Sequence, residues 1–299
     1  MDAIADKIKE SACHVLCLQE TKRETFDAFY IKKFCPRSLD KFAFSPSIGA
    51  SGGLLTVWNS SLFDGTVVQA NSYAISIKLI CRFDNTCMHI SNIYGPSNPA
   101  QKMAFVTWLM NLNTDDFDNW ALGGDFNLIR NPNNRNQPGG DPAEMNLFND
   151  LISDLDLVEI PFSGRSFTWS NMQDDPLLVK LDWVFTSIGW TSFPATFVQP
   201  LSRPISDHIP FVLQIGSTVP RPSLFRFENF GLQHPGFLET VCLHWHNSPF
   251  FGNAARNISS RFKHTRAGLK LWSKNLSSLN KLIYKCKWVL LLLDGLEDQ

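Results

Sequence analysis

The most constraining feature of this sequence is the segment 120–127, where an apolar run meets two glycines and ends in a carboxylate and an amide. The segment reads Trp-Ala-Leu-Gly-Gly-Asp-Phe-Asn. Residues i and i+2 of an extended segment point the same way, so we expect Asp125 and Asn127 to face one site while Phe126 turns into the core. The alternative is simple turn chemistry, because both polar side chains can also bond their own backbone.

Four further polar motifs each stand at the end of an apolar run that predicts a strand. They are Gln19-Glu20-Thr21, Tyr94-Gly95-Pro96, Leu181-Asp182 and Ser206-Asp207-His208. A buried carboxylate without a partner is costly, so Asp182 should have one. His208 follows as the candidate, since an imidazole oriented by a carboxylate is the arrangement that a catalytic histidine needs.

Two of these motifs suggest ligand chemistry. Glu20 ends a short apolar run, and a carboxylate at a strand end suits Mg²⁺, which prefers oxygen ligands. The Tyr94 hydroxyl could donate a hydrogen bond to a phosphate oxygen. Each residue also has a plain structural alternative: Gln-Glu is a common exposed pair, and tyrosine is often half-buried.

Periodicity predicts an alternation of strands and helices. Helical spacing predicts helices over 1–11, 100–112 and 144–155, and apolar runs predict strands over 14–18, 42–44, 53–58, 67–69, 74–81, 88–94, 178–185 and 211–215. Asp84-Asn85 is the expected hairpin turn. Helical periodicity with basic residues resumes from about residue 253 to 293.

Composition separates the chain into two parts. Residues 1–215 carry 16 Lys/Arg against 23 Asp/Glu, whereas residues 216–299 carry 11 against 5. An acidic first part suits a carboxylate-rich metal site, and a basic tail suits a polyanionic partner or is simply a solvated helical face. The 24 phenylalanines and 9 tryptophans predict a sizeable core.

Cysteine usage and hydropathy indicate an intracellular protein without a membrane partner. The 7 cysteines form no CxxC pair, which favours reduced thiols over a disulfide framework. Residues 1–10 carry charge throughout and do not read as a secretory signal. The longest apolar run, 288–293, is far shorter than the roughly 20 residues that span a bilayer.

In their order and context, these motifs resemble the endonuclease/exonuclease/phosphatase superfamily, the fold of the apurinic-site DNA endonucleases. Within it, the nearest resemblance is to the endonuclease domain of plant long-interspersed-element (non-LTR) retrotransposons, over residues 1–215. The resemblance implies an α+β fold: two packed, mainly antiparallel sheets flanked by helices, a four-layer α/β sandwich. Residues 216–299 then form a linker and a basic helical extension, similar to the segment before a reverse transcriptase.

The resemblance also implies a role for each motif in magnesium-dependent nicking of DNA. Glu20 and Asp207 would hold Mg²⁺, or alternatively Mn²⁺, and Asp125 would orient or deprotonate the attacking water. Asn127 and Tyr94 would bind the phosphate, and His208, held by Asp182, would stabilise the pentavalent state of the phosphorus. Thr168 and Trp169 would approach the DNA. Trp169 could stack on a base or lie in the core. The implied partners are DNA and, through the basic tail, the element's RNA, and the implied location is the nucleus.

The beginning of the sequence departs from the family pattern. Members of the family open with an asparagine-bearing strand, whereas here the helix over 1–11 comes first. Either the chain is a truncated copy or its start was misassigned. As it stands, we expect a weakened fold and little nuclease activity. Two other functions remain open: an inactive remnant of the endonuclease, and a magnesium-dependent phosphatase of the same superfamily.

Overall fold

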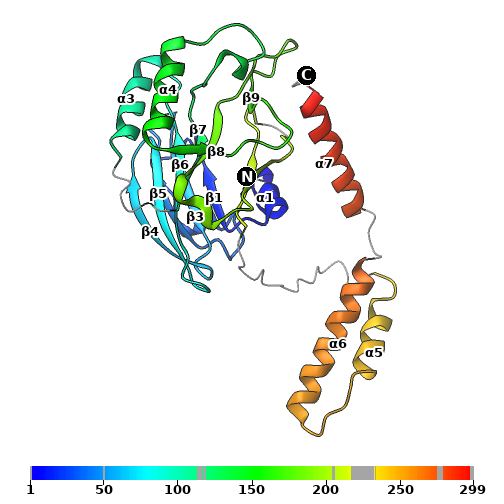
Figure 1. Ribbon diagram of the computed structural model, residues 1–299. Helices are drawn as coiled ribbons and strands as arrows, with labels where there is room; N and C mark the ends of the chain where they lie inside the picture. Colours follow the sequence, from blue (N-terminus) through cyan, green and yellow to red (C-terminus); the bar gives the residue numbers. More distant parts are fainter. Residues whose placement is uncertain are drawn as a thin grey trace. The chain divides into compact units, whose positions relative to one another are not determined.

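The computed structural model describes residues 2–49, 51–112, 117, 119–203, 206–216, 232, 234–274 and 279–296 (Figure 1). By the density of its internal contacts the chain divides into two compact units. One comprises Met1–Thr218 with Leu290–Gln299, and the other comprises Val219–Val289. We describe each unit by itself.

A six-stranded sheet is the largest element of the first unit. Its strand order is β4-β5-β6-β7-β11-β8. The strands are β4 (Phe63–Ala70), β5 (Ala74–Cys81), β6 (Cys87–Tyr94), β7 (Trp120–Asp125), β11 (Asp182–Ser187) and β8 (Leu157–Glu159). Only the β6–β7 pair is parallel. The predicted hairpin turn is present, since Asn85 adopts φ 58° between β5 and β6.

The parallel β6–β7 pair requires a crossover, and α3 (Pro99–Met110) provides it. With α4 (Pro142–Asp154), α3 packs on one face of the six-stranded sheet (Figure 1). The interface is aromatic and fully buried: Phe105 of α3 and Phe148 of α4 contact Phe126, which follows β7. Burial of these apolar side chains stabilises the packing of α3 and α4 on the sheet.

A three-stranded antiparallel sheet covers the other face. Its order is β1-β3-β2, from β1 (Val15–Leu18), β3 (Leu54–Trp58) and β2 (Lys41–Ser45). Its outer face packs against α1 (Asp2–Ser11) and α2 (Ala28–Ile31) through Ile8, Ile31, Leu55 and Val57. The order helix–sheet–sheet–helix confirms the expected α+β fold of two packed, mainly antiparallel sheets flanked by helices.

Two short pairs complete the unit: β9 (Trp169–Ser170) with β10 (Leu178–Val179), and β12 (Phe197–Pro200) with β13 (Phe211–Gln214). Two 3₁₀ turns, Pro132–Asn134 and Ile188–Ser192, lie in the connections. The continuous strand predicted over 178–185 is wrong, because it divides into β10 and β11. At the break the Lys180 N–H donates to the Asn134 carbonyl and the Leu181 N–H to the Thr168 hydroxyl, so neither belongs to a strand ladder.

The second unit contains α5 (Phe237–His246) and α6 (Ala254–Lys274). The boundary between the units falls within α7 (Leu279–Leu296), after Val289. The helices α5 and α6 pack through the edge-to-face contact of Trp245 with Phe262. Gly268 permits this close approach, since a Cβ there would lie 2.0 Å from His244 Cδ2. Among the described residues, the helices are all too short or too polar to cross a bilayer.

Candidate active site at the strand ends

Three polar side chains meet at one edge of the six-stranded sheet. β7 ends at Asp125, and the first residue of β11, Asp182, lies directly opposite it in the antiparallel register. β6 ends at Tyr94, which is the parallel neighbour of Asp125. Residues more than fifty positions apart in sequence are thereby brought side by side by strand pairing.

Asp125 is 6% exposed, and its carboxylate accepts two hydrogen bonds from Asn127. The Asn127 backbone N–H donates to Oδ1 at 2.9 Å and the Asn127 amide donates to Oδ2 at 2.7 Å. Phe126 is buried between them, as expected. The two polar side chains lie together, but through a local turn in which Asn127 adopts φ 52° and not along an extended strand. Their sharing of a functional site stays a prediction.

His208 lies between the two carboxylates. Its Nδ1 is 2.8 Å from Asp182 Oδ2, and its Nε2 is 3.9 Å from Asp125 Oδ2. The predicted partnership of Asp182 with a histidine is confirmed by this contact. Together Asp125, Asp182 and His208 offer ligand atoms within 4.8 Å of one another, and among the described residues they are the cluster of this kind that could hold a metal ion.

Thr168 positions Asp182 through hydrogen bonds to the backbone at the start of β11. Its side chain is 1% exposed, and its hydroxyl accepts hydrogen bonds from the backbone N–H groups of Leu181 at 3.0 Å and Asp182 at 2.9 Å. This fixes the start of β11 where the ladder is interrupted. No local sequence pattern indicates this role, because Thr168 and its two partners are separated in the chain and the partners contribute backbone N–H groups.

The electrostatics of the cluster follow from two opposed carboxylates and one imidazole. Burial first, and then the negative charge of Asp182, raise the pKa of Asp125 to about 7, against the opposing effects of His208 and the Asn127 hydrogen bonds. Burial lowers the pKa of His208, but Asp182 and Asp125 outweigh it and bring that pKa to about 9. His208 is therefore a cation at neutral pH.

Tyr94 connects this cluster to Glu20. Burial raises the pKa of Tyr94 to about 12, and the negative charges of Glu20 and Asp125 contribute to the increase. The phenol therefore stays protonated at physiological pH and can act as a hydrogen-bond donor.

Glu20 and Asp207, the two predicted metal ligands, lie outside the three-residue cluster. Glu20 is exposed at φ 50°, and its Oε1 is 3.3 Å from Lys22 Nζ. Asp207 is exposed and its Oδ2 accepts a hydrogen bond from the Trp169 indole N–H at 3.1 Å. Their sharing of one ion stays a prediction.

The donor set at the strand ends fits a divalent metal in its chemistry. Hard cations select carboxylate oxygens, and Asp125, Asp182 and His208 bring two carboxylates and one imidazole together with ligand atoms within 4.8 Å of one another. Asp182 Oδ2 contacts the imidazole, and both Asp125 oxygens accept hydrogen bonds from Asn127. The Glu20 carboxylate is exposed beside Lys22.

Thr168 and Trp169, predicted to approach DNA, make contacts inside the protein. Trp169 is half-buried and packs on a small cluster formed by Ile129, Met145 and Val179. Contact of either residue with DNA stays a prediction.

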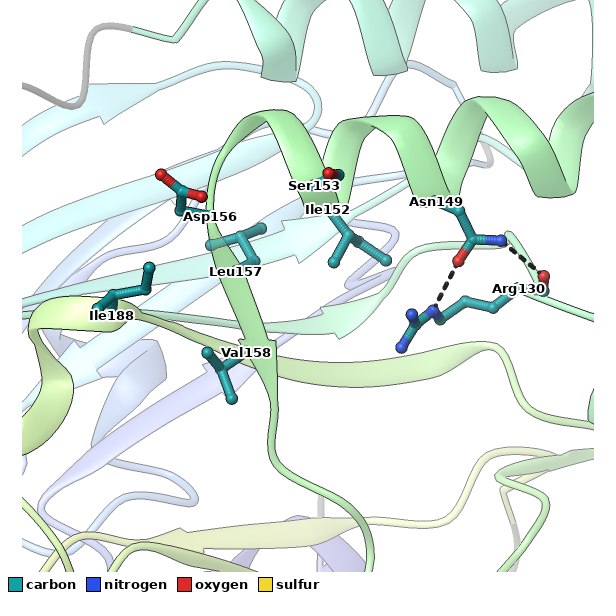
Figure 2. Close-up of a pocket in the computed structure, with 8 residues that line it drawn as sticks. All are labelled: Arg130, Asn149, Ile152, Ser153, Asp156, Leu157, Val158 and Ile188. Atoms are coloured by element: carbon teal, nitrogen blue, oxygen red, sulfur yellow. Dashed lines mark hydrogen bonds between the residues drawn. The ribbon is translucent and has the colours of Figure 1, made fainter.

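A separate pocket of about 310 Å³ lies between α4, β8 and the turn at Ile188 (Figure 2). Arg130 and Asn149 exchange two hydrogen bonds at one side of it: Arg130 Nε donates to Asn149 Oδ1 at 2.9 Å, and Asn149 Nδ2 donates to the Arg130 carbonyl at 2.8 Å. None of the strand-end residues lines this pocket. The polar motifs therefore do not converge on it.

Comparison with solved structures gives the class of the fold. AP endonuclease LMAP from Leishmania major superposes with a TM-score of 0.55 at 17% identity, covering 71% of this chain and 81% of that one. The endonuclease domain of TRAS1, a telomere-specific non-LTR retrotransposon, gives 0.54 at 12% identity, covering 73% and 92%. The catalytic domain of Xenopus laevis APE2 gives 0.53 at 15% identity, covering 71% and 86%. The chain has the fold of the endonuclease/exonuclease/phosphatase proteins.

A search of protein sequences also finds a relative, which is a transposon protein. The chain is 23% identical over 232 residues to the "Transposon TX1 uncharacterized 149 kDa protein" of Xenopus laevis, which covers 74% of this chain. The matched part spans 18% of that much longer protein. No model of a known protein family matches the chain.

Proposed function

We propose that this chain is a magnesium-dependent endonuclease that nicks DNA as part of a retrotransposon protein. The observation that carries the proposal is the cluster of Asp125, Asp182 and His208 within 4.8 Å at one sheet edge. Likeness to AP endonucleases and to the TRAS1 endonuclease domain supports this chemistry, and likeness to the TX1 protein supports the retroelement context.

Each side chain has a role that its environment suits. Asp125, with a pKa of about 7, orients or deprotonates the attacking water. His208, a cation held by Asp182, stabilises the negative charge that develops on the pentavalent phosphate. Asn127 and the protonated Tyr94 contact the phosphate oxygens.

Glu20, with Asp207, holds the divalent ion in this proposal. When bound, Mg²⁺ or Mn²⁺ neutralises phosphate charge and polarises the phosphorus–oxygen bond. The Lys22 ammonium, 3.3 Å from the Glu20 carboxylate, is the cation that an incoming metal must displace or accommodate.

The test is plasmid nicking by purified protein with and without Mg²⁺. Asp125→Ala and His208→Ala should each reduce nicking by at least about 100-fold, the usual contribution of an acid–base group. Asp64→Ala is the matched control, since Asp64 lies 72% exposed on β4. Circular dichroism establishes that each variant is folded.

A second arm uses the same variants in a chain extended by an asparagine-bearing strand before residue 1, because the family resemblance places such a strand there. Mg²⁺-dependent nicking that Asp125→Ala abolishes, in either form, supports the proposal. Activity within tenfold of the parent in Asp125→Ala would remove that residue from the mechanism. Hydrolysis of lipid or nucleotide phosphates without nicking would assign the site to a phosphatase instead.

The basic helix α6 supports a second nucleic-acid contact, with the element's RNA. Arg256, Lys263 and Lys270 are exposed at seven-residue intervals, about 10 Å apart along one helix face. Helix α6 has no acidic residue. Replacing the three with glutamine should weaken RNA retention in a gel-shift assay and flatten its salt dependence. In this proposal the protein acts in the nucleus, where its DNA target lies.

A further inference from the structure

The amide of Asn92 joins the two sheets directly beneath the turn that carries Glu20. Asn92 belongs to β6, where it pairs with Ile75 of β5 and Gly123 of β7. It is 0% exposed, and it precedes Tyr94 by two residues. The strand that ends in Tyr94 therefore also carries a fully buried amide.

The hydrogen bonds of this side chain go to the three-stranded sheet and to Gln19, the residue that follows β1. Nδ2 donates to the Leu18 carbonyl at 3.2 Å, the Leu55 carbonyl at 3.1 Å and the Thr56 hydroxyl at 3.2 Å. Oδ1 accepts from the Gln19 side-chain amide at 2.6 Å. Asn92 therefore holds the two residues that come immediately before Glu20.

The Glu20 turn needs this support because its backbone is in a sparsely populated region. Glu20 and Lys22 adopt φ values of 50° and 52°, which favour glycine. The turn is fastened on its other side by two backbone bonds, from Thr21 N–H to the Gly53 carbonyl at 3.1 Å and from Lys22 N–H to the Gly52 carbonyl at 3.0 Å. Gln19 is the link between these bonds and the six-stranded sheet.

Gln19 also lies beside the strand that ends in Asp125. A Cβ on Gly124 would come within 3.0 Å of Gln19 Nε2, so the glycine leaves the space that the Gln19 amide uses. One chain of contacts thus runs from Asp125's strand through Gln19 and Asn92 to Glu20.

We infer that Asn92 and Gln19 are positioning residues that fix the Glu20 carboxylate relative to Asp125 for metal binding. The inference rests on the proposed function, in which Glu20 is a metal ligand. Neither residue reaches the reacting atoms; each acts through the turn. The hydrogen bond between the Gln19 and Asn92 side chains can be removed by a substitution at Gln19. Such a substitution does not disturb the core, because Gln19 is only half-buried.

The test compares Gln19→Met with the parent in the full 299-residue chain. The substitution keeps the length of the side chain and removes the donor to Asn92. It should weaken Mn²⁺ binding, measured by calorimetry, by about tenfold, as loss of a residue supporting a metal ligand typically does. It should also accelerate hydrogen exchange at the Thr21 and Lys22 amides by about tenfold, while exchange in the strand cores is unchanged.

Ser76→Ala is the matched control. It removes a buried 2.7 Å hydrogen bond between Ser76 and Ser91 in β5 and β6, with no connection to Glu20. It should leave both readouts at the parent value. Asn92→Leu breaks the connection from the other end and should exceed Gln19→Met in both effects; if it does not fold, Gln19→Met still decides.

Parent-like exchange at Thr21 and Lys22 together with parent-like Mn²⁺ affinity in Gln19→Met would overturn the inference. A parent that binds no Mn²⁺ would refute the proposed metal site, and the exchange rates alone would then decide whether the pair positions the turn.

Discussion

At the scale of the residue, the site depends on how three ionisable groups share charge. Asp125 and Asp182 face one another across β7 and β11, and His208 contacts both. One proton on the imidazole therefore reduces the repulsion of two buried carboxylates. The pH dependence of the metal-free protein follows from this arrangement.

The pKa of His208 is raised from 6.5 to about 9, so its interactions stabilise the folded state fully below pH 6.5. That stability is lost as the pH rises through 9. In EDTA, the difference in unfolding free energy between parent and His208→Gln should be largest at pH 6 and should shrink by pH 10. Urea titrations at the two pH values measure it. An equal difference at both would show that His208 is neutral in the folded protein.

Thr168 gives a stability prediction at the same scale. Thr168→Val keeps the shape but leaves the buried N–H groups of Leu181 and Asp182 without their acceptor. Each unpaired buried group costs about 1–3 kcal/mol, so the variant should lose at least about 2 kcal/mol of unfolding free energy. Thr66→Val, on an exposed strand position, is the control and should stay within about 0.5 kcal/mol of the parent.

At the scale of the element, the two glycines of β7 have different tasks. Gly124 adopts φ 142°, and a Cβ there would lie 2.1 Å from the Ile93 carbonyl oxygen of the parallel strand β6. At Gly123 the nearest atom to a Cβ would be the Val184 Cγ2 methyl at 3.3 Å. The close approach of β6 and β7, which places Tyr94 beside Asp125, therefore depends on Gly124.

This difference predicts unequal effects of the same substitution. Gly124→Ala should lower the unfolding free energy by more than about 3 kcal/mol or prevent folding, because the strained backbone and the clash act together. Gly123→Ala should cost clearly less, since a methyl group can shift. Thermal melts of the two variants test this, and equal melting temperatures would show that β7 does not need its glycine at 124.

At the scale of the whole molecule, the chain has two compact units with different chemistry. The first, which comprises Met1–Thr218 with Leu290–Gln299, carries the cluster of Asp125, Asp182 and His208. The second is a helical unit rich in basic residues. The predicted boundary after residue 215 and the predicted linker stay predictions, because residues 217–231 lie outside the described part.

Limited proteolysis tests that boundary. The first cut should fall between Gly216 and Pro222, where Ser217, Thr218 and prolines predict an accessible linker. Mass spectrometry of the early fragments identifies the site. A first cut inside residues 42–58 would contradict the division, because β2 and β3 lie there in the core of the first unit.

The sequence by itself determined the helices over 2–11, 99–110 and 142–154, most strands of the two sheets, and the polar residues at the strand ends. Alternating burial leaves a direct record in hydrophobic pattern, and Asp125, Asp182 and His208 could be selected because each is a polar residue that follows or begins an apolar run. The tertiary structure alone decided which of these residues meet. Cross-strand register places Asp182 opposite Asp125, the Thr168 hydroxyl interrupts the strand predicted over 178–185, and Asn92 fastens one sheet to the other. These contacts join residues far apart in the chain, and no local pattern encodes a hydrogen bond whose partner is set by the packing of two sheets.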